Sequence, residues 1–258
     1  MRGSSFVRRS QECSTPEMVW SVVFGIPAAV APSLDEHSLT IMLARADAEQ
    51  AGSLRPLLSL EELARSRRFL HGLDTCTFSQ AHGLKRWLLS SVLGRNPDEL
   101  EFRYTGCGKP ELVHHPDLFL SLSHTREAVA VAVTRLGPCG IDVEGKRELT
   151  DIEAIAAETF SQSGVQRVAS ARDPLKAFMR EWTMVEAASK SIGCGLVASR
   201  ELQIAVRPLI GRANYTGGSV YVGPVHGLHP DLHLAWACAR CPRRIDILVS
   251  HLEELAGA

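Results

Sequence analysis

The sequence predicts an α+β fold in which most strands pair antiparallel. Helical and strand patterns alternate in mixed order on both sides of residue 138, which favours segregated α+β packing over a doubly wound parallel sheet. The 258 residues suffice for one large domain or two small ones. Neither GxGxxG nor GxxxxGK[ST] occurs, so we expect no Rossmann or Walker nucleotide site.

Strands are predicted where short segments are rich in apolar and β-branched residues. Thr125, Arg126 and Glu127 separate two such segments and predict a hairpin. The predicted strands are residues 19–24, 39–43, 118–123, 129–133, 139–144, 201–206, 219–223 and 232–239.

Helices are predicted from apolar periodicity and from capping residues. Ser59 and Glu62 have the spacing of a capping box. Asp173 before Pro174 is typical of a helix start, and a glycine follows two of the helices. The predicted helices are residues 59–70, 75–93 (ending at Gly94), 152–160, 173–192 (ending at Gly193) and a short one near the C-terminus.

Three segments are expected along the chain. Residues 1–17 are polar, and we expect a disordered N-terminal extension. Residues 18–138 form the predicted N-terminal α+β subdomain. Residues 139–258 form the C-terminal α+β subdomain, which carries most of the acidic candidate residues.

Composition excludes some functions. The net charge is −1 and the hydrophobic fraction is 45%, so we expect no nucleic-acid partner. The basic clusters at Arg65, Arg67 and Arg68 and at Lys85 and Arg86 are typical of solvated helix faces.

The cysteines and the N-terminus indicate a cytoplasmic protein. The seven cysteines do not form a disulfide pattern, and the CxxC pair Cys238 and Cys241 has no second pair beside it. Residues 18–31 faintly resemble an export signal, but Pro27 interrupts them and the stretch is too short to span a bilayer. We expect no membrane association.

The most informative residues are acidic. Asp142 and Glu144, two apart, share one face of a predicted strand, and Glu186 and Lys190, four apart, share one face of a predicted helix. Separately, these are ordinary exposed acids and a surface ion pair. If strand and helix pack together, three carboxylates and an ammonium converge, which suits a hard cation and a phosphate.

Two further motifs contain polar groups near turns. Ser123 and His124 end a predicted strand, and Lys109 lies in the glycine-rich turn 106–110. Each is unremarkable alone, although each can bind phosphate. A Ser–His–Asp hydrolase is disfavoured because Ser123 and His124 point to opposite strand faces and no GxSxG elbow occurs.

Read in order, four motifs resemble the Sfp-type 4′-phosphopantetheinyl transferase family. They are GKP at 108–110, SLSHT at 121–125, GIDVE at 140–144 and WTMVEAASKSIGCGL at 182–196. The resemblance spans roughly residues 39–240. It implies two similar α+β subdomains related by a pseudo-twofold axis, with the active site in the cleft between them, so that a monomer suffices.

The resemblance also implies a reaction and roles for its residues. Coenzyme A would donate its phosphopantetheine arm to a serine of an apo acyl or peptidyl carrier protein, releasing 3′,5′-ADP. Asp142, Glu144 and Glu186 would bind Mg²⁺, with Mn²⁺ as an alternative. Glu186 would help to deprotonate the serine, and Lys190 would stabilise the diphosphate. The residues implied to face coenzyme A are Arg65, Lys109, Ser123, His124, Asp142, Glu186 and Lys190.

The sequence departs from the family pattern at four positions. Glu62 and Thr77 stand where basic residues are common, Val185 replaces a lysine, and Gly164 replaces a glutamate. These departures leave two alternatives open: a non-catalytic carrier-binding or coenzyme A-binding protein of the same fold, and a metal-dependent hydrolase of the coenzyme A diphosphate. Carrier proteins are typically acidic near their serine. We therefore also expect a basic docking surface that includes some of Arg65, Arg67, Arg68 and Arg86.

Overall fold

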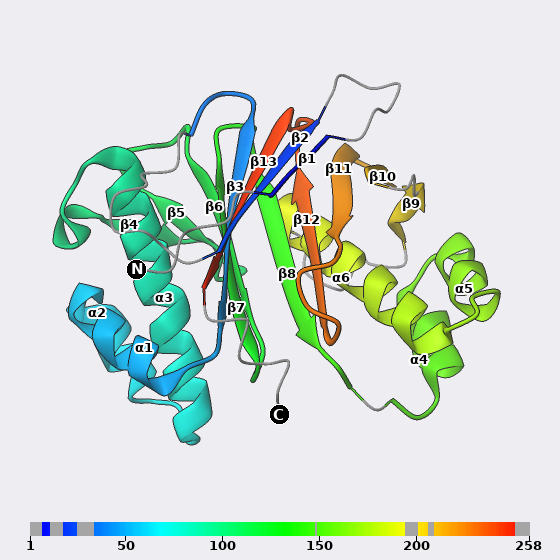
Figure 1. Cartoon of the computed structure of the whole chain (residues 1–258), viewed down its shortest axis with the longest axis horizontal. Coiled ribbons are helices and arrows are strands. Elements are labelled where there is room, and N and C mark those ends of the chain that lie inside the picture. Colours follow the sequence, from blue (N-terminus) through cyan, green and yellow to red (C-terminus); the bar gives the residue numbers. More distant parts are fainter. Residues whose placement is uncertain are drawn as a thin grey trace.

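The computed structural model describes residues 7–10, 18–24, 34–147, 149–193, 201–205 and 209–250. Two β-sheets face each other in the middle of the molecule, and a long helix covers the outer face of each (Figure 1). The layers therefore follow the order helix, sheet, sheet, helix. This arrangement confirms the predicted α+β class.

The first sheet has the strand order β1-β2-β13-β3-β7-β6. Its strands are β1 (Val7–Ser10), β2 (Val19–Phe24), β3 (Ser38–Arg45), β6 (Phe119–His124), β7 (Ala128–Thr134) and β13 (Arg244–Ser250). Most neighbours are antiparallel, but β13 runs parallel to both β2 and β3. The C-terminal strand is thus central in a sheet built otherwise from the N-terminal half.

The second sheet is antiparallel, with the order β8-β12-β11-β10-β9. Its strands are β8 (Cys139–Gly145), β9 (Gln203–Ala205), β10 (Gly211–Tyr215), β11 (Gly218–Val225) and β12 (Leu232–Cys238). A separate small hairpin pairs β4 (Phe102–Tyr104) with β5 (Pro110–Leu112).

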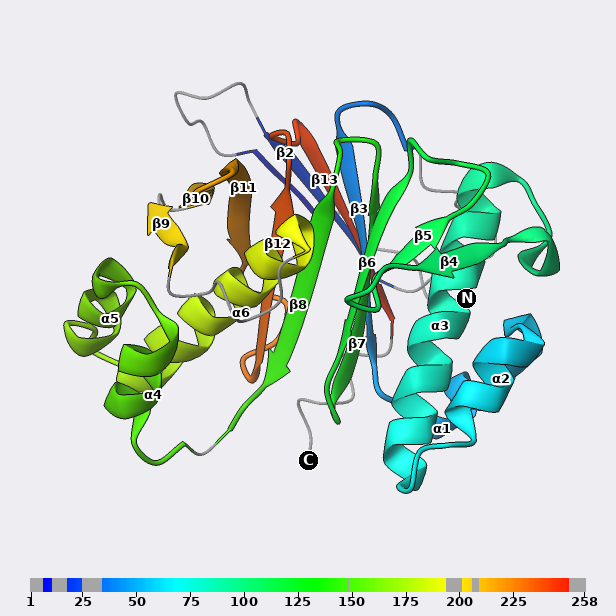
Figure 2. The ribbon, with the colours of Figure 1, turned by 180° about the vertical axis from the view of Figure 1, so that it is seen from behind.

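Two long helices flank the sheets, and the reverse view in Figure 2 separates them clearly. α3 (Gly72–Leu93) covers the first sheet and α6 (Pro174–Ile192) covers the second. The shorter helices are α1 (Ala48–Leu54), α2 (Leu60–Ser66), α4 (Ile152–Thr159) and α5 (Gln162–Ala169), with 3₁₀ turns at Arg55–Leu57 and Pro97–Glu99.

Strand alternation divides the buried side chains among three apolar clusters. Ile41 of β3 and Ile141 of β8 face each other's sheet in the central cluster, which also contains Trp236. Met42 points the other way, toward α3, and Ala235 points toward α6. Because side chains alternate along a strand, Asp142 and Glu144 are left on the face of β8 that meets α6.

The predicted helix caps are confirmed, although α2 ends at Ser66 and not at residue 70, and α3 begins at Gly72 and not at residue 75. The Ser59 side chain accepts from the Glu62 backbone, and the Glu62 side chain accepts from Ser59, which completes the capping box of α2. Asp173 caps α6 by accepting from the backbone of Lys176. Gly94 and Gly193 end α3 and α6 in the left-handed region, at φ 62° and 80°, where glycine is least strained.

The division at residue 138 needs one correction. β13 lies in the segment predicted to belong to the C-terminal subdomain, yet it pairs within the first sheet. Its apolar side chains pack on both faces of the first sheet. Ile247 belongs to the central cluster, and Leu248 belongs to the cluster under α3. The strands that the sequence did not predict are β1, β4, β5, β10 and β13.

The predicted N-terminal extension is described only in part. Residues 7–10 form β1, which pairs with β2. The rest of residues 1–17 lies outside the described residues, as do residues 251–258 and 194–200. Within the described part of the chain, none of the helices has the length and apolar character needed to cross a bilayer.

Candidate functional site

The candidate site lies where β6 of the first sheet meets β8 of the second. The Ser121 hydroxyl accepts a hydrogen bond of 3.1 Å from the backbone of Ile141 across this seam. On the other side of β8, Gly140 permits backbone contact with α6, because a Cβ there would lie 1.9 Å from the carbonyl oxygen of Ala187. Motifs that are distant in sequence therefore meet.

Asp142, Ser123 and Lys190 form the centre of the site. The Lys190 ammonium donates to Asp142 Oδ1 at 2.6 Å and to Ser123 Oγ at 3.0 Å. Ser123 Oγ in turn donates to Asp142 Oδ1 at 2.9 Å. Asp142 is buried, and its second oxygen, Oδ2, has no hydrogen-bond partner. The predicted convergence of strand and helix is present for these residues.

Glu144 is held by different groups. Its Oε1 accepts from Trp182 Nε1 at 3.1 Å, and its Oε2 pairs with Arg147 Nη2 at 2.6 Å. Arg147 is a site residue that the motifs did not indicate. The sequence feature that could have indicated it is its position, three residues after Glu144 and just beyond the end of the strand.

Burial raises the pKa of all three predicted metal-binding carboxyls. For Asp142 the Lys190 ammonium and the Ser123 hydroxyl oppose this effect. For Glu144 the nearby Asp142 carboxylate adds to it, and Arg147 opposes it. Glu186 is half-buried, and its pKa is raised by burial and by Asp142 against the opposing charge of Lys190. The carboxyls therefore repel one another through space.

The carboxylates fit a hard cation by chemistry but do not form a ready cage. Among the described residues, no group of three or more His, Cys, Asp or Glu side chains is arranged so that it could hold a metal ion. Lys190 and Arg147 neutralise Asp142 and Glu144 instead. Nevertheless, Asp142 Oδ2 is buried without a partner, and oxygen ligands are those that Mg²⁺ prefers. These oxygen donors therefore suit such an ion by type, although they are not arranged around a common point.

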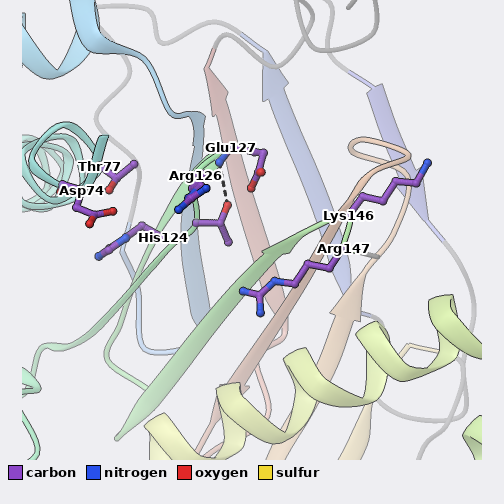
Figure 3. A pocket seen from close by; sticks show the side chains of 8 residues that line it. Asp74, Thr77, His124, Arg126, Glu127, Lys146 and Arg147 are labelled. Carbon is purple, nitrogen blue, oxygen red and sulfur yellow. Dashed lines mark hydrogen bonds between the residues drawn. The ribbon is translucent and has the colours of Figure 1, made fainter. Parts of the chain in front are cut away.

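A cavity of about 470 Å³ adjoins this centre (Figure 3). It opens between α3, the β6–β7 hairpin and the residues after β8. Three cations, two carboxylates and a histidine line it, and two of the cations pair with carboxylates outside the lining, Arg147 with Glu144 and Lys146 with Asp231. The lining residues are Asp74, Thr77, His124, Thr125, Arg126, Glu127, Lys146 and Arg147. His124 therefore lies beside the centre, next to Ser123 in the chain.

Two of the predicted coenzyme A residues have other contacts. Lys109 Nζ donates to the carbonyl oxygens of Cys139 at 2.7 Å and Lys190 at 2.9 Å. The exposed Arg65 guanidinium lies over the rings of Phe78 and Tyr104, 5.5 and 5.8 Å from their centroids. Neither lines the cavity.

Lys85 and Arg86 are buried, which corrects the predicted solvated helix face and removes Arg86 from the docking surface. Both bind the buried Glu62 carboxylate, at 2.6 Å each, and His82 Nδ1 lies 3.1 Å from it. The physical reason is that α2 packs its acidic face on α3, so these cations pair internally. Glu62 is accordingly a structural residue that ties α2 to α3.

The other departures also have structural explanations. Val185 is buried in the apolar cluster under α6, where a lysine would lose its hydration. A Cβ at Gly164 would lie 2.9 Å from Glu181 Oε1, and Arg167 Nε donates to Glu181 Oε2 at 3.1 Å, so this ion pair fills the space beside Gly164. Thr77 is buried and donates to the carbonyl oxygen of Asp74.

Comparison with known proteins agrees with this geometry. The family model described as the 4′-phosphopantetheinyl transferase superfamily matches residues 138–221. The 4′-phosphopantetheinyl transferase HetI of Nostoc sp. is 33% identical over 164 residues, covering 62% of this chain and 69% of HetI. The chain belongs to this superfamily. The predicted family is thereby confirmed.

A second relative is slr0495 of Synechocystis sp., a candidate 4′-phosphopantetheinyl transferase. It is 29% identical over 144 residues, covering 54% of this chain and 58% of slr0495. The phosphopantetheinyl transferase segment at 138–221 contains β8 and α6. These two elements carry Asp142, Glu144, Glu186 and Lys190.

Proposed function

We propose that this chain transfers the 4′-phosphopantetheine arm of coenzyme A to a serine of an apo acyl or peptidyl carrier protein. The carriers would serve polyketide, nonribosomal peptide or fatty-acid synthesis, and the enzyme would act as a cytoplasmic monomer. The observation that carries the proposal is the contact of Lys190 with Asp142 and Ser123 across the seam, beside a cavity lined by charged side chains. Membership of the superfamily supports it.

The reaction exchanges the phosphoanhydride linkage of the donor for a phosphoester linkage to the serine. The serine oxygen bonds to the phosphorus of the phosphopantetheine, the bond to the second phosphate breaks, and 3′,5′-ADP leaves. The half-buried Glu186 takes the serine proton, directly or through a water. Lys190 compensates the charge that develops on the leaving phosphate.

Asp142, Glu144 and Glu186 would hold a divalent ion, which we propose to be Mg²⁺, with Mn²⁺ able to replace it. When bound, the ion would neutralise the diphosphate and orient it. The chain's own donors would orient the donor substrate. The His124 imidazole lines the cavity, and Ser123 is its neighbour in the chain, which supports the proposal that both bind phosphate oxygens of the donor.

The test is a transfer assay with purified protein, coenzyme A, Mg²⁺ and a panel of apo carriers, read by carrier mass. We expect a phosphopantetheine mass gain on at least one carrier. Asp142→Ala and Glu186→Ala should each lower the rate by about 10²- to 10³-fold and keep the fold. Glu111→Ala, at an exposed carboxylate of β5 paired with Arg103, is the matched control.

The same assay separates the alternatives. No mass gain on any carrier, with coenzyme A still bound, would indicate a binding protein that kept the fold. Release of 3′,5′-ADP without a carrier would indicate a hydrolase. Near-normal transfer by Asp142→Ala at limiting Mg²⁺ would refute the metal assignment.

We further propose that the carrier docks at the junction of α2 and α3. Arg67 and Arg68 are exposed there, and Leu70 beside them is 95% exposed, which suits an acidic partner with an apolar side chain. Reversing both charges with Arg67→Glu and Arg68→Glu should raise KM for the carrier about tenfold and leave KM for coenzyme A unchanged. Arg55→Glu, also exposed, is the control. An unchanged carrier KM would place the docking surface elsewhere.

A further inference from the structure

We infer that Lys109 is a positioning residue that joins the two halves of the molecule and fixes the catalytic end of α6. It lies in the turn between β4 and β5, on the N-terminal half, and its ammonium donates to two backbone carbonyl oxygens on the C-terminal half. The inference rests on the proposed function and assigns Lys109 a role other than contact with the nucleotide.

The turn is built to present this side chain. Gly108 adopts φ 77°, in the left-handed region that favours glycine. The Thr105 backbone donates to the carbonyl oxygen of Lys109 at 2.9 Å, and Thr105 Oγ1 accepts from the Lys109 backbone at 3.1 Å. The lysine backbone is therefore fixed before its side chain reaches across.

The two acceptors of Lys109 lie on the elements that carry the site. The Cys139 carbonyl, 2.7 Å away, begins β8, which leads to Asp142. The Lys190 carbonyl, 2.9 Å away, lies in the last turn of α6. An ammonium at a helix C-terminus is favourable because the carbonyls there lack helical partners and carry partial negative charge.

Lys190 is consequently held at both ends. Its carbonyl accepts from Lys109, while its own ammonium contacts Asp142 and Ser123. A second contact from the same turn reinforces the first, because the Cys107 thiol donates to the Gly193 carbonyl oxygen at 3.4 Å. Displacing the last turn of α6 would therefore move the Lys190 ammonium relative to its two partners.

Two measurements test the inference with Lys109→Met. Hydrogen exchange of the amides in residues 187–193 should be about tenfold faster, since the last turn opens more readily. The kcat for transfer should fall about 10- to 100-fold, since small misplacements of a catalytic group are costly, while KM for coenzyme A changes less than about twofold. Lys109→Arg keeps a cationic donor. It should therefore retain most of the original kcat and most of the original protection of these amides from exchange. Lys109→Gln replaces Lys109→Met if the latter does not fold.

The matched control is Arg103→Met, on the same hairpin, which removes an exposed cation paired with Glu111. It should change neither readout. A raised KM for coenzyme A with unchanged kcat and exchange would overturn the inference and make Lys109 a donor contact. Faster exchange with unchanged kcat would also overturn the positioning role. Absence of transfer in the unmodified protein would refute the proposed function, whereas the exchange measurement would still decide whether Lys109 secures α6.

Discussion

At the scale of single residues, the site is a balance of charges. Each buried carboxylate of β8 already has a cation beside it: Lys190 for Asp142 and Arg147 for Glu144. A divalent ion must share or replace these partners. The two cations differ in exposure, since the Lys190 side chain is 31% exposed and the Arg147 side chain 54%. Arg147 is the easier of the two to displace.

The competition between Arg147 and a metal ion leads to a prediction. Arg147→Met should tighten binding of Mn²⁺, followed by electron paramagnetic resonance, by about two- to fivefold, because a partly exposed ion pair of up to ~1 kcal/mol no longer has to break. Arg126→Met removes another cation from the same cavity and should change the affinity less. Weaker binding in Arg147→Met alone would show instead that Arg147 supports the ion.

A second residue-scale prediction concerns Gly140. A Cβ there would lie 1.9 Å from the Ala187 carbonyl oxygen and 2.7 Å from the Ser191 nitrogen, both backbone atoms of α6. Gly140→Ala must therefore push the helix off the strand. We expect a loss of about 3 kcal/mol in the free energy of unfolding, measured by urea denaturation.

The control for Gly140→Ala is Gly52→Ala. Gly52 lies in α1, and a Cβ there would have nothing within 4 Å. That change should be neutral or stabilise by up to about 1 kcal/mol, because alanine favours helix. Equal stabilities of the two variants would contradict the close approach of β8 and α6.

At the scale of elements, α2 is attached to α3 by a buried ionic cluster. The Glu62 carboxylate forms ion pairs with Lys85 and Arg86, and the His82 imidazole lies in contact with it. Burial would raise the pKa of Glu62, but the hydrogen bond to His82 and the charge of Lys85 outweigh it and hold the pKa far below its usual range. Burial in turn lowers the pKa of His82 to about 4. The cluster is thus built around a carboxylate that stays ionised.

This cluster predicts that a basic residue at 62 is not tolerated. Glu62→Lys would place an ammonium among Lys85 and Arg86 and leave both unpaired, at a cost of about 3–5 kcal/mol, measured by thermal and urea unfolding. Glu61→Lys, on the exposed face of the same helix, should cost less than about 0.5 kcal/mol. A stable Glu62→Lys variant with a lower KM for coenzyme A would show that position 62 faces the donor after all.

At the scale of the whole molecule, the two halves are joined by more than the site. β13 from the C-terminal end lies between β2 and β3 in the first sheet, and its Ile245 and Ile247 are fully buried. The strands of the N-terminal half therefore pack around a strand that lies about 200 residues further along the chain than β3. The halves are unlike independent domains in this respect.

This arrangement predicts that truncations at the two ends differ. Deleting residues 244–258 should abolish cooperative unfolding of the whole molecule, since the centre of the first sheet loses a strand. Deleting residues 1–10 removes β1 from the edge of the sheet and should leave a cooperative transition. Circular dichroism during thermal unfolding would measure both. A cooperative transition in the C-terminal truncation would show that β2 and β3 pair without β13.

Local sequence was sufficient for much of the fold and for the central site residues. Capping residues such as Ser59 and Asp173 act within one helical turn, and spacings of two and four fix which side chains share a face. Those rules placed Asp142 with Glu144, and Glu186 with Lys190. They did not place β13 in the first sheet, because pairing between distant strands depends on tertiary contacts.

By itself, the sequence determined the α+β class and which carboxylates and lysine share a strand or helix face, because these are properties of local spacing, and its motifs resembled the family to which the chain belongs. Only the tertiary structure decided which charges pair. It buried Lys85 and Arg86 on Glu62, set Arg147 against Glu144, and directed Lys109 to the end of α6. The physical reason is that charge pairing depends on the distance between groups and on their burial. Both depend on how elements that are far apart in the chain pack together.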